Sequence, residues 1–457
     1  MPNSVLLKDL LILTKDGEWG KGESSDDTEE MFVIRGTDFA NVRYGDLSEV
    51  PIRFISKQIA ERKRLEPNDI LIETAGGTKD QPTGRTVFLK PRLFERSKRP
   101  ITCASFSRFL RVDTTVAVPE YVFWYLQFLY HTGEIEQHQV QHTGIARFQY
   151  TKFAQSIEIP LPPLPEQKAI AHILGTLDDK IELNREMNQT LEAMARAIFK
   201  SWFVDFDPVR AKMEGRQPAG MDAATAELFP SEFEESALGM IPKGWRVGTL
   251  GDLIDIKHGY AFKGEFFRTE PPGDILLTPG NFAVGGGFKD DKFKYYLGEV
   301  PEDFVLDEGD LLVTMTDLSK AGDTLGYPAI IPVPRRNRYL HNQRLGKIII
   351  KRDALISKLH LYYLLRLDAY RNEVLASATG TTVKHTSPDR IKAFEFPFAD
   401  NGISLKFEQV ISSLICRISL NDEQSRLLAS IRDTLLPKLL SGEIRVKEAK
   451  KLVETVA

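Results

Sequence analysis

Side chains that can hydrogen-bond to the edges of DNA bases are concentrated in a few short segments of this chain. Arg pairs with guanine, and Gln or Asn with adenine, through two hydrogen bonds in the major groove. The candidates in the first half are Thr78, Lys79, Gln81, Thr83, Arg85, Gln141, His142, Arg147 and Gln149. Those in the second half are Thr316, Ser319, Lys320, Gln343, Arg344, Thr381, Lys384 and His385. The alternative is ordinary turn chemistry, since Gly, Thr, Asn and Asp favour turns in any protein.

Each half also contains one strongly basic segment. Residues 51–111 hold 14 Lys or Arg and 6 Asp or Glu, a net charge of +8. Residues 335–352 hold no acid and the bases Arg335, Arg336, Arg338, Arg344, Lys347, Lys351 and Arg352. Lys and Arg that neutralise phosphates supply sequence-independent affinity for DNA. The two segments therefore predict contact with a duplex at two places, and the alternative is an ordinary surface balanced by nearby acids.

The total charge conceals these segments. The 457 residues hold 60 bases and 64 acids, so the formal net charge of −4 excludes a uniformly basic nucleic-acid coat. The two cysteines exclude a disulfide framework and favour a reducing compartment. Because the start lacks a signal-peptide pattern and no apolar run is long enough to span a membrane, a cytoplasmic location is expected.

No motif in the chain predicts a catalytic centre. The phosphate-binding pattern GxxxxGK[ST] is absent, and so is the methyltransferase tetrapeptide of Asn or Asp, two prolines and an aromatic residue. The histidines His131, His138, His142 and His172 lack cysteine partners and the spacing of a zinc site. We therefore predict no catalytic residues and no metal site.

A repeat with a shift of 236 to 241 residues organises the basic and polar segments. LEPNDIL at 65–71 corresponds to LDEGDLL at 306–312, and a Thr-Gly pair at 143–144 corresponds to one at 379–380. Aromatic-rich stretches, PEYVFWYLQFLYHTG and SKLHLYYLLRLDAYRNE, predict a helical region before each pair. Features that recur in one order indicate a duplicated domain, and the mixture of strand and helix patterns predicts an α+β fold.

Each copy ends in a long helix with an apolar residue about every 3.5 positions. The first apolar seam runs from Ile170 to Trp202 and the second from Phe407 to Leu439. Both seams are interrupted at the same place by polar residues, which are Asn184, Asn188, Asn421 and Ser425. A sustained period of 3.5 is typical of coiled coils. We predict an antiparallel pair about 50 Å long in which Asn184 faces Asn421. The alternative is two unrelated amphipathic helices, each packed on its own domain.

These patterns divide the chain into five parts. They are a first globular domain at 1–160, a long helix at 161–204, a connector at 205–244, a second globular domain at 245–400, and a second long helix with its tail at 401–457. The connector is acidic, with 4 bases and 8 acids, and is expected to run over the surface.

Three stretches resemble the specificity subunits of type I restriction-modification systems. IPLPPLPEQKAIAHILGTLDDKIELNREMNQTLEAMARAIFKSWFVDFDPVR at 159–210 is similar to the central conserved region of that family. IPKGWRVGTLGDLIDIKHGYAF at 241–262 is similar to the opening of a target-recognition domain, and LLPKLLSGEIRV at 435–446 to the conserved end. The first domain departs from the family pattern because it lacks the IPKGW-type opening.

The resemblance implies a non-catalytic subunit whose two target-recognition domains each read one half of a split DNA site. The helices would act as a spacer and dock two methyltransferase subunits, and restriction subunits would complete the complex. S-adenosylmethionine, ATP and Mg²⁺ would be bound only by those partners. Trp202 and Phe203, near the end of the first long helix, are the candidate docking side chains. The alternatives are a stand-alone DNA-modifying enzyme and a coiled-coil scaffold that binds only proteins.

Overall fold

The computed structural model describes residues 3–77, 81–142, 145–290, 292–334, 337–400 and 402–454. The chain forms two compact units. Unit 1 combines residues 1–189 with residues 418–457, and unit 2 comprises residues 190–417. Both boundaries between the units fall inside long helices. Each unit therefore consists of one globular domain and part of each long helix, whereas the five parts expected from the sequence follow the ends of motifs.

Unit 1 is built on a four-stranded antiparallel sheet in the order β2-β9-β5-β7. These strands are β2 (Leu11–Asp16), β9 (Ser107–Val112), β5 (Ile70–Glu73) and β7 (Thr86–Phe88). A three-stranded sheet consists of β4 (Ile52–Ser56), β3 (Thr28–Ile34) and β8 (Ile101–Cys103), in which β3 and β8 are parallel. The first strand, β1 (Asn3–Leu6), pairs with β12 (Glu158–Leu161) just before the first long helix. The short helices are α1 (Phe39–Val42), α2 (Lys57–Lys63), α3 (Pro91–Arg96) and α5 (Tyr150–Ser156).

Unit 2 repeats this arrangement. Its four-stranded sheet has the order β16-β25-β21-β23, from β16 (Ile254–His258), β25 (Leu345–Ile350), β21 (Leu311–Thr314) and β23 (Pro328–Ile330). A second sheet contains β17 (Phe267–Arg268), β19 (Lys294–Tyr296), β18 (Asp274–Leu277), β24 (Tyr339–His341) and β20 (Val305–Leu306). Strands β18 and β24 are parallel, like β3 and β8, and β15 (Arg246–Thr249) pairs with β27 (Glu395–Phe398), like β1 with β12. The same strand order in both units confirms the predicted duplication.

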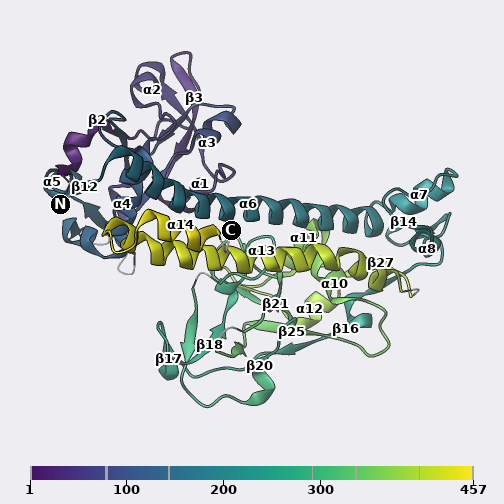
Figure 1. Ribbon diagram of the computed structural model, residues 1–457. Coiled ribbons are helices and arrows are strands. Elements are labelled where there is room, and N and C mark those ends of the chain that lie inside the picture. Colours follow the sequence, from purple (N-terminus) through teal and green to yellow (C-terminus); the bar gives the residue numbers. More distant parts are fainter. Residues whose placement is uncertain are drawn as a thin grey trace. The chain divides into compact units, whose positions relative to one another are not determined.

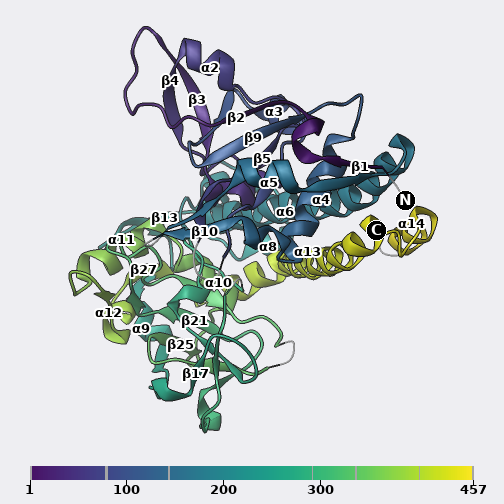
Figure 2. The same ribbon diagram turned by 90° about the vertical axis from the view of Figure 1, so that its left-hand side faces the viewer.

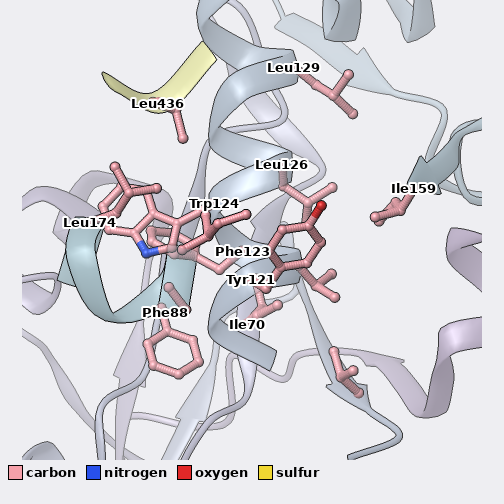
Figure 3. Close-up of a cluster of buried hydrophobic side chains, with 14 of the residues drawn as sticks. Ile70, Phe88, Tyr121, Phe123, Trp124, Leu126, Leu129, Ile159, Leu174 and Leu436 are labelled. Carbon is pink, nitrogen blue, oxygen red and sulfur yellow. The ribbon is translucent and has the colours of Figure 1, made fainter. Parts of the chain in front are cut away.

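The aromatic-rich stretch of the first half forms α4 (Pro119–His131), the central helix of the unit 1 core. Apolar side chains cover most of its circumference, which is typical of a helix that is buried on several sides. Figure 3 shows Trp124 beside Leu174 of the first long helix and Tyr121 on the side of α4 that faces Ile159. The Tyr121 hydroxyl donates a 2.8 Å hydrogen bond to the carbonyl of Pro160, so the polar end of this buried ring is satisfied. The corresponding stretch of the second half is divided into α10 (Lys358–Leu364) and α11 (Asp368–Ser377).

The two long helices are α6 (Leu164–Phe203) and α13 (Ile403–Leu440), with 40 and 38 residues. At 1.5 Å per residue each is about 60 Å long, somewhat longer than the prediction. Within each unit their ribbons run side by side in opposite directions (Figures 1 and 2). In unit 1, Asp178 contacts Arg432 while Asn188, further along α6, contacts Asp422, nearer the start of α13. The pair is therefore antiparallel, as predicted.

Most seam positions in unit 1 are buried, which supports the period of 3.5. The buried apolar members are Ile170, Leu174, Leu177 and Ile181 on α6 and Leu428, Leu435 and Leu439 on α13. The helix α14 (Val446–Glu454) follows α13 and places Ala449 and Val453 in the same core. No helix in the described part of the chain is long and apolar enough to cross a membrane.

The connector belongs to unit 2 and contains regular structure of its own. It holds α7 (Asp207–Met213), α8 (Ala223–Glu227) and a hairpin of β13 (Phe233–Ser236) and β14 (Gly239–Pro242). The carboxylate of Asp222 accepts a hydrogen bond from the backbone N–H of Thr225 and caps α8. The remaining short helices of unit 2 are α9 (Leu250–Leu253) and α12 (Pro388–Lys392).

Candidate nucleic-acid interface

Three segments of the chain meet at one edge of unit 1. A hydrogen bond of 2.9 Å from Ser107 N to Ala104 O closes the tight turn at residues 104–107, between β8 and β9. The carbonyl of Phe106 accepts a 2.8 Å hydrogen bond from Thr74 N, and the carbonyl of Thr74 accepts one of 2.9 Å from Phe148 N. From there β6 (Ala75–Gly77) pairs with β11 (Ile145–Phe148), which pairs with β10 (Gln139–His142). The two polar segments of the first half therefore belong to one surface.

The same hydrogen bonds occur at the corresponding edge of unit 2. The turn at residues 342–345 is closed by a 3.0 Å bond from Leu345 N to Asn342 O. The carbonyl of Arg344 accepts from Met315 N at 2.9 Å, and the carbonyl of Met315 accepts from Thr386 N at 3.0 Å. Beside them, β22 (Thr316–Asp317) pairs with β26 (Lys384–His385). All three polar segments of the second half therefore meet at this edge, and we call the two surfaces the polar edges of unit 1 and unit 2.

Two candidates of unit 1 stabilise the polar edge from inside. Thr83 is fully buried, and its N–H and hydroxyl both donate to Oε1 of Gln139, at 2.8 and 3.2 Å. Arg85 donates two hydrogen bonds, of 2.6 and 2.9 Å, to the buried carboxylate of Glu73, which raises the pKa of Arg85. The prediction that Thr83 and Arg85 contact bases is therefore corrected, because Thr83 is buried and donates to β10 while Arg85 is paired with Glu73. The other described candidates are Gln81 and Arg147, which are exposed, and Gln149, which is half-buried.

In unit 2 the loop that follows β22 is fixed by Asp317. Its carboxylate accepts hydrogen bonds from Ser319 N at 2.6 Å and from the Thr324 hydroxyl at 2.7 Å. Burial raises the pKa of Asp317, but these hydrogen bonds outweigh it and hold the pKa below its ordinary value. Thr316 is buried, with its hydroxyl 3.2 Å from Nδ1 of His385. The candidates that remain accessible are Lys320, Gln343, Arg344, Thr381 and His385, which are exposed, and Ser319 and Lys384, which are half-buried.

Some of the predicted residues lie outside the part of the chain that the structure describes. These are Thr78, Lys79, Arg335 and Arg336, together with the side chains of Gln141 and His142 on β10.

The basic segment at residues 51–111 is largely neutralised within unit 1. Ion pairs involve nine of its 14 bases, which are Lys63, Arg64, Arg85, Lys90, Arg92, Arg96, Arg99, Arg108 and Arg111. Around α3, the side chain of Arg92 pairs with Asp179 and with the buried Glu182 on α6. The interpretation of this segment as a phosphate-binding stripe is therefore corrected, since most of its bases pair with acids of unit 1. Lys90, Arg92 and Arg96 attach the globular domain to α6.

Part of the second basic segment is neutralised in the same way. Arg338 pairs with Asp274 at 2.7 Å and with Glu302 at 2.8 Å, and Lys347 pairs with Asp310 at 2.6 Å. A DNA contact by Arg338 therefore stays a prediction, in which phosphate would compete with these two acids. Arg344 is different because it is exposed on the polar edge and forms no ion pair with a described residue.

The polar interruption of the helix seams is a buried hydrogen-bond network in unit 1. Nδ2 of Asn184 lies 3.0 Å from Oε1 of Gln424, 3.2 Å from the Ser425 hydroxyl and 3.3 Å from the backbone carbonyl of Asn421. The side-chain amide of Asn421 donates instead to Oδ1 of Asn188, at 2.8 Å. Asn184 therefore meets Asn421 as predicted, but at the backbone, and the amide-to-amide bond links Asn421 to Asn188.

The two aromatic residues expected to dock partner subunits are core residues. Trp202 and Phe203 are only 4% and 7% exposed, and their ring centroids lie 6.0 and 5.4 Å from that of Phe407 on α13. The expectation is corrected because these rings stabilise unit 2 and are not presented at its surface.

The described residues do not assemble a metal site. No group of three or more His, Cys, Asp or Glu residues among them is arranged to hold a metal ion. Cys103 is buried and Cys416 is exposed, and both are free thiols. Burial raises the pKa of the Cys103 thiol to about 12, so this cysteine is a poor nucleophile.

Comparison with known proteins agrees with this geometry. The model of the type I restriction modification DNA specificity domain matches residues 60–193 and 242–412, one match in each half. The specificity subunit of the type I restriction enzyme MjaIX of Methanocaldococcus jannaschii is 26% identical over 337 residues, covering 71% of this chain and 69% of that protein. The HindI specificity subunit of Haemophilus influenzae is 29% identical over 343 residues, covering 63% and 69%.

Among solved structures, the S subunit of a type I restriction-modification system from M. genitalium has a similar fold. Its TM-score is 0.50 at 14% identity, and the match covers 96% of this chain and 95% of that one. The family match, the duplicated unit and the paired long helices lead to one conclusion. The chain belongs to the type I restriction-modification DNA specificity family.

Proposed function

We propose that this chain is the non-catalytic subunit that recognises DNA in a type I restriction-modification complex. Each unit reads one half of a split target through its polar edge. The chain carries no reaction itself, and methylation and cleavage belong to partner subunits. The family match and the relatives named above support this proposal.

The observation that carries the proposal is the recurrence of one scaffold with different exposed side chains. The backbone hydrogen bonds of the two polar edges are the same, whereas the residues that they present differ. Exposed residues include Gln81 and Arg147 in unit 1 and Gln343, Arg344 and His385 in unit 2. Side chains with donors suited to guanine and adenine make direct readout possible. A shared scaffold with different side chains suits a protein that reads two different sequences.

The partners follow from the same assignment. The proposed complex contains two methyltransferase subunits bound along the helices, and restriction subunits complete it. S-adenosylmethionine, ATP and Mg²⁺ would be bound by these partners. Exposed apolar side chains on the helices, including Leu183 on α6 and Leu420 and Leu427 on α13, are better docking candidates than the buried Trp202 and Phe203.

Duplex binding by the chain, purified with its methyltransferase partner, tests the proposal. Arg147 on β11 and Lys384 on β26 are basic residues of the two polar edges, and Lys384 precedes His385, the residue that corresponds to Arg147. Replacing either with Ala should weaken binding to all sequences and reduce the slope of log K against log salt by about 1, because one phosphate contact is lost. Arg338→Ala is the matched control, since Asp274 and Glu302 already neutralise Arg338.

Unchanged binding in both Arg147→Ala and Lys384→Ala would contradict the assignment of the polar edges to DNA. Methyl transfer to DNA by the purified chain alone would favour a stand-alone enzyme instead. Failure of the complex to bind any duplex would favour a scaffold that binds only proteins.

A further inference from the structure

We propose that the tight turns at residues 104–107 and 342–345 are equivalent base-reading elements of the two units. In this assignment Phe106 contacts a thymine methyl group in one half of the target, and Arg344 reads a guanine in the other half. The inference rests on the proposed function and deepens it, because it identifies which base each turn recognises.

The equivalence of the two turns rests on their backbone contacts. Phe106 and Arg344 each occupy the third position of a turn closed by a hydrogen bond. The carbonyl of each accepts a hydrogen bond from the backbone N–H of the residue just before the next strand of the polar edge, Thr74 or Met315. The residue numbers differ by 238, which lies within the repeat shift. Phe106 was not among the residues predicted from the sequence, because those candidates were side chains that hydrogen-bond to base edges.

A glycine stands behind each turn at the same place. A Cβ on Gly17 would overlap the carbonyl of Cys103, and a Cβ on Gly259 would overlap the carbonyl of Asn342. Glycine is required where two backbones approach this closely. Each turn is therefore packed against the residue that follows a strand, β2 in unit 1 and β16 in unit 2, which fixes the backbone that carries the side chain at its tip.

The turn of unit 2 is fixed further by its own side chain. Oδ1 of Asn342 accepts a 3.0 Å hydrogen bond from Arg344 N, and Gln343 N donates to the carbonyl of Tyr260 at 2.9 Å. The guanidinium of Arg344 is exposed, while its backbone is held at both ends of the turn. A pre-positioned arginine of this kind is suited to two parallel hydrogen bonds with guanine O6 and N7.

Phe106 is 64% exposed although its backbone is as well fixed as that of Arg344. Its carbonyl accepts a 3.3 Å hydrogen bond from Ala75 N as well as the bond from Thr74 N, and Ala75 is paired with the exposed Arg147 across β6 and β11. Single exposed apolar residues are common on proteins. This one lies two strands from the proposed phosphate contact, on a rigid turn at a polar edge, where Phe can contact the methyl group of thymine.

The two units would then each bind the DNA backbone through a cation of the polar edge and read different bases. Arg147 in unit 1 and Lys384 in unit 2, which lies one residue before the counterpart of Arg147, supply these backbone contacts. The turn residue supplies a difference between the half-sites. The consequence is that exchanging the turn residues should change the preferred base at one position of one half-site and leave the other half-site unchanged.

A selection from a random-sequence duplex library tests this inference. The chain would be used in complex with its methyltransferase partner, as wild type and as the variants Phe106→Arg, Phe106→Ala and Arg344→Phe. Phe106→Arg should change one position of one half-site from thymine to guanine, and Arg344→Phe should produce the opposite change in the other. The discrimination lost at the position that Arg344 reads should be about 5- to 150-fold, the range that corresponds to one good bidentate pair.

The control is Ile12→Ala in unit 1. Ile12 is also 64% exposed, but it lies at the other end of β2 from Asp16, which pairs with Arg108 next to the turn. The complex that contains Ile12→Ala should select the same sequence as the wild-type complex. This inference alone is overturned if the wild-type complex selects a split sequence and the Phe106→Arg and Arg344→Phe complexes select the same one. A wild-type complex that selects no sequence overturns the proposed function and this inference with it.

Discussion

A single buried carboxylate connects the globular part of unit 1 to both long helices. Asp178 on α6 is 1% exposed. Its Oδ2 accepts a 2.7 Å hydrogen bond from Nε of Arg43, which follows α1, and its Oδ1 pairs with Arg432 on α13. Arg432 occupies a position of the apolar seam, and this ion pair explains how a cation is accommodated there. We predict that Asp178→Asn strongly destabilises unit 1.

The magnitude follows from the burial of all three partners. Burial alone would raise the pKa of Asp178, but the guanidinium groups of Arg43 and Arg432 outweigh it and lower the pKa below its ordinary value. An amide at position 178 keeps the shape and removes the charge. The side chain of Arg432 is 9% exposed and that of Arg43 is 16% exposed, so neither can recover the lost interaction with water. Removing one member of a buried ion pair costs about 3–5 kcal/mol.

Native-state amide hydrogen exchange at neutral pH measures this cost, because it reports the free energy of opening for the segments 164–189 and 418–440 separately. Asp179→Asn is the matched control. Asp179 is the next residue, its side chain is 56% exposed, and it pairs with Lys90 and Arg92 at the surface. Exposed pairs contribute about 0–1 kcal/mol, so the two variants should differ by about 2 kcal/mol or more.

The pH dependence provides a second test of the same reasoning. Because the pKa of Asp178 is lowered in the folded state, its stabilisation is complete above the ordinary value of 3.8 and is lost as the pH falls through the folded value. The difference in the free energy of opening between wild type and Asp178→Asn should therefore become smaller only in strong acid. An Asp178→Asn protein that opens as rarely as Asp179→Asn at neutral pH would refute the argument.

Three further variants test the packing of the fold. Burial raises the pKa of Glu120 to about 7. The free energy of unfolding should therefore fall by up to about 3 kcal/mol as the pH rises from 5 to 8 and the buried carboxyl loses its proton. Thermal unfolding of Glu120→Gln, measured across this pH range, should lack that decrease. A variant with the same pH profile as the wild type would contradict the prediction. Asn184→Leu leaves Oε1 of Gln424 without its donor, so the free energy of opening measured by hydrogen exchange should fall by about 1–3 kcal/mol. Gln189→Leu, at an exposed position of the same helix, is the control and should leave it unchanged. Trp202→Ala should cost about 3–5 kcal/mol in thermal unfolding, whereas Lys200→Ala, at a 62% exposed side chain, should cost almost nothing.

The repeat and the long helices could be predicted from the sequence because they depend on local patterns. A strand alternates and a helix seam recurs every 3.5 residues whatever lies opposite, so Ile170 to Trp202 and Phe407 to Leu439 predicted two helices with one shared interruption. The aromatic-rich stretch before position 131 likewise predicted the buried helix α4. Each of these features is confirmed by an element in the structure.

The partners of individual side chains were decided only by the tertiary structure. Arg92 and Glu182 are 90 residues apart, and Asp178 and Arg432 are 254 apart, so a count of charges along the chain could not pair them. For the same reason the segment at 51–111 was expected to bind phosphate, although most of its bases bind acids of unit 1. Trp202 and Phe203 were expected to dock partners as aromatic residues near the helix end, yet they pack against Phe407 in the core of unit 2. Local periodicity determines which elements form, whereas a charge or a ring acquires its role from the residues that folding brings beside it.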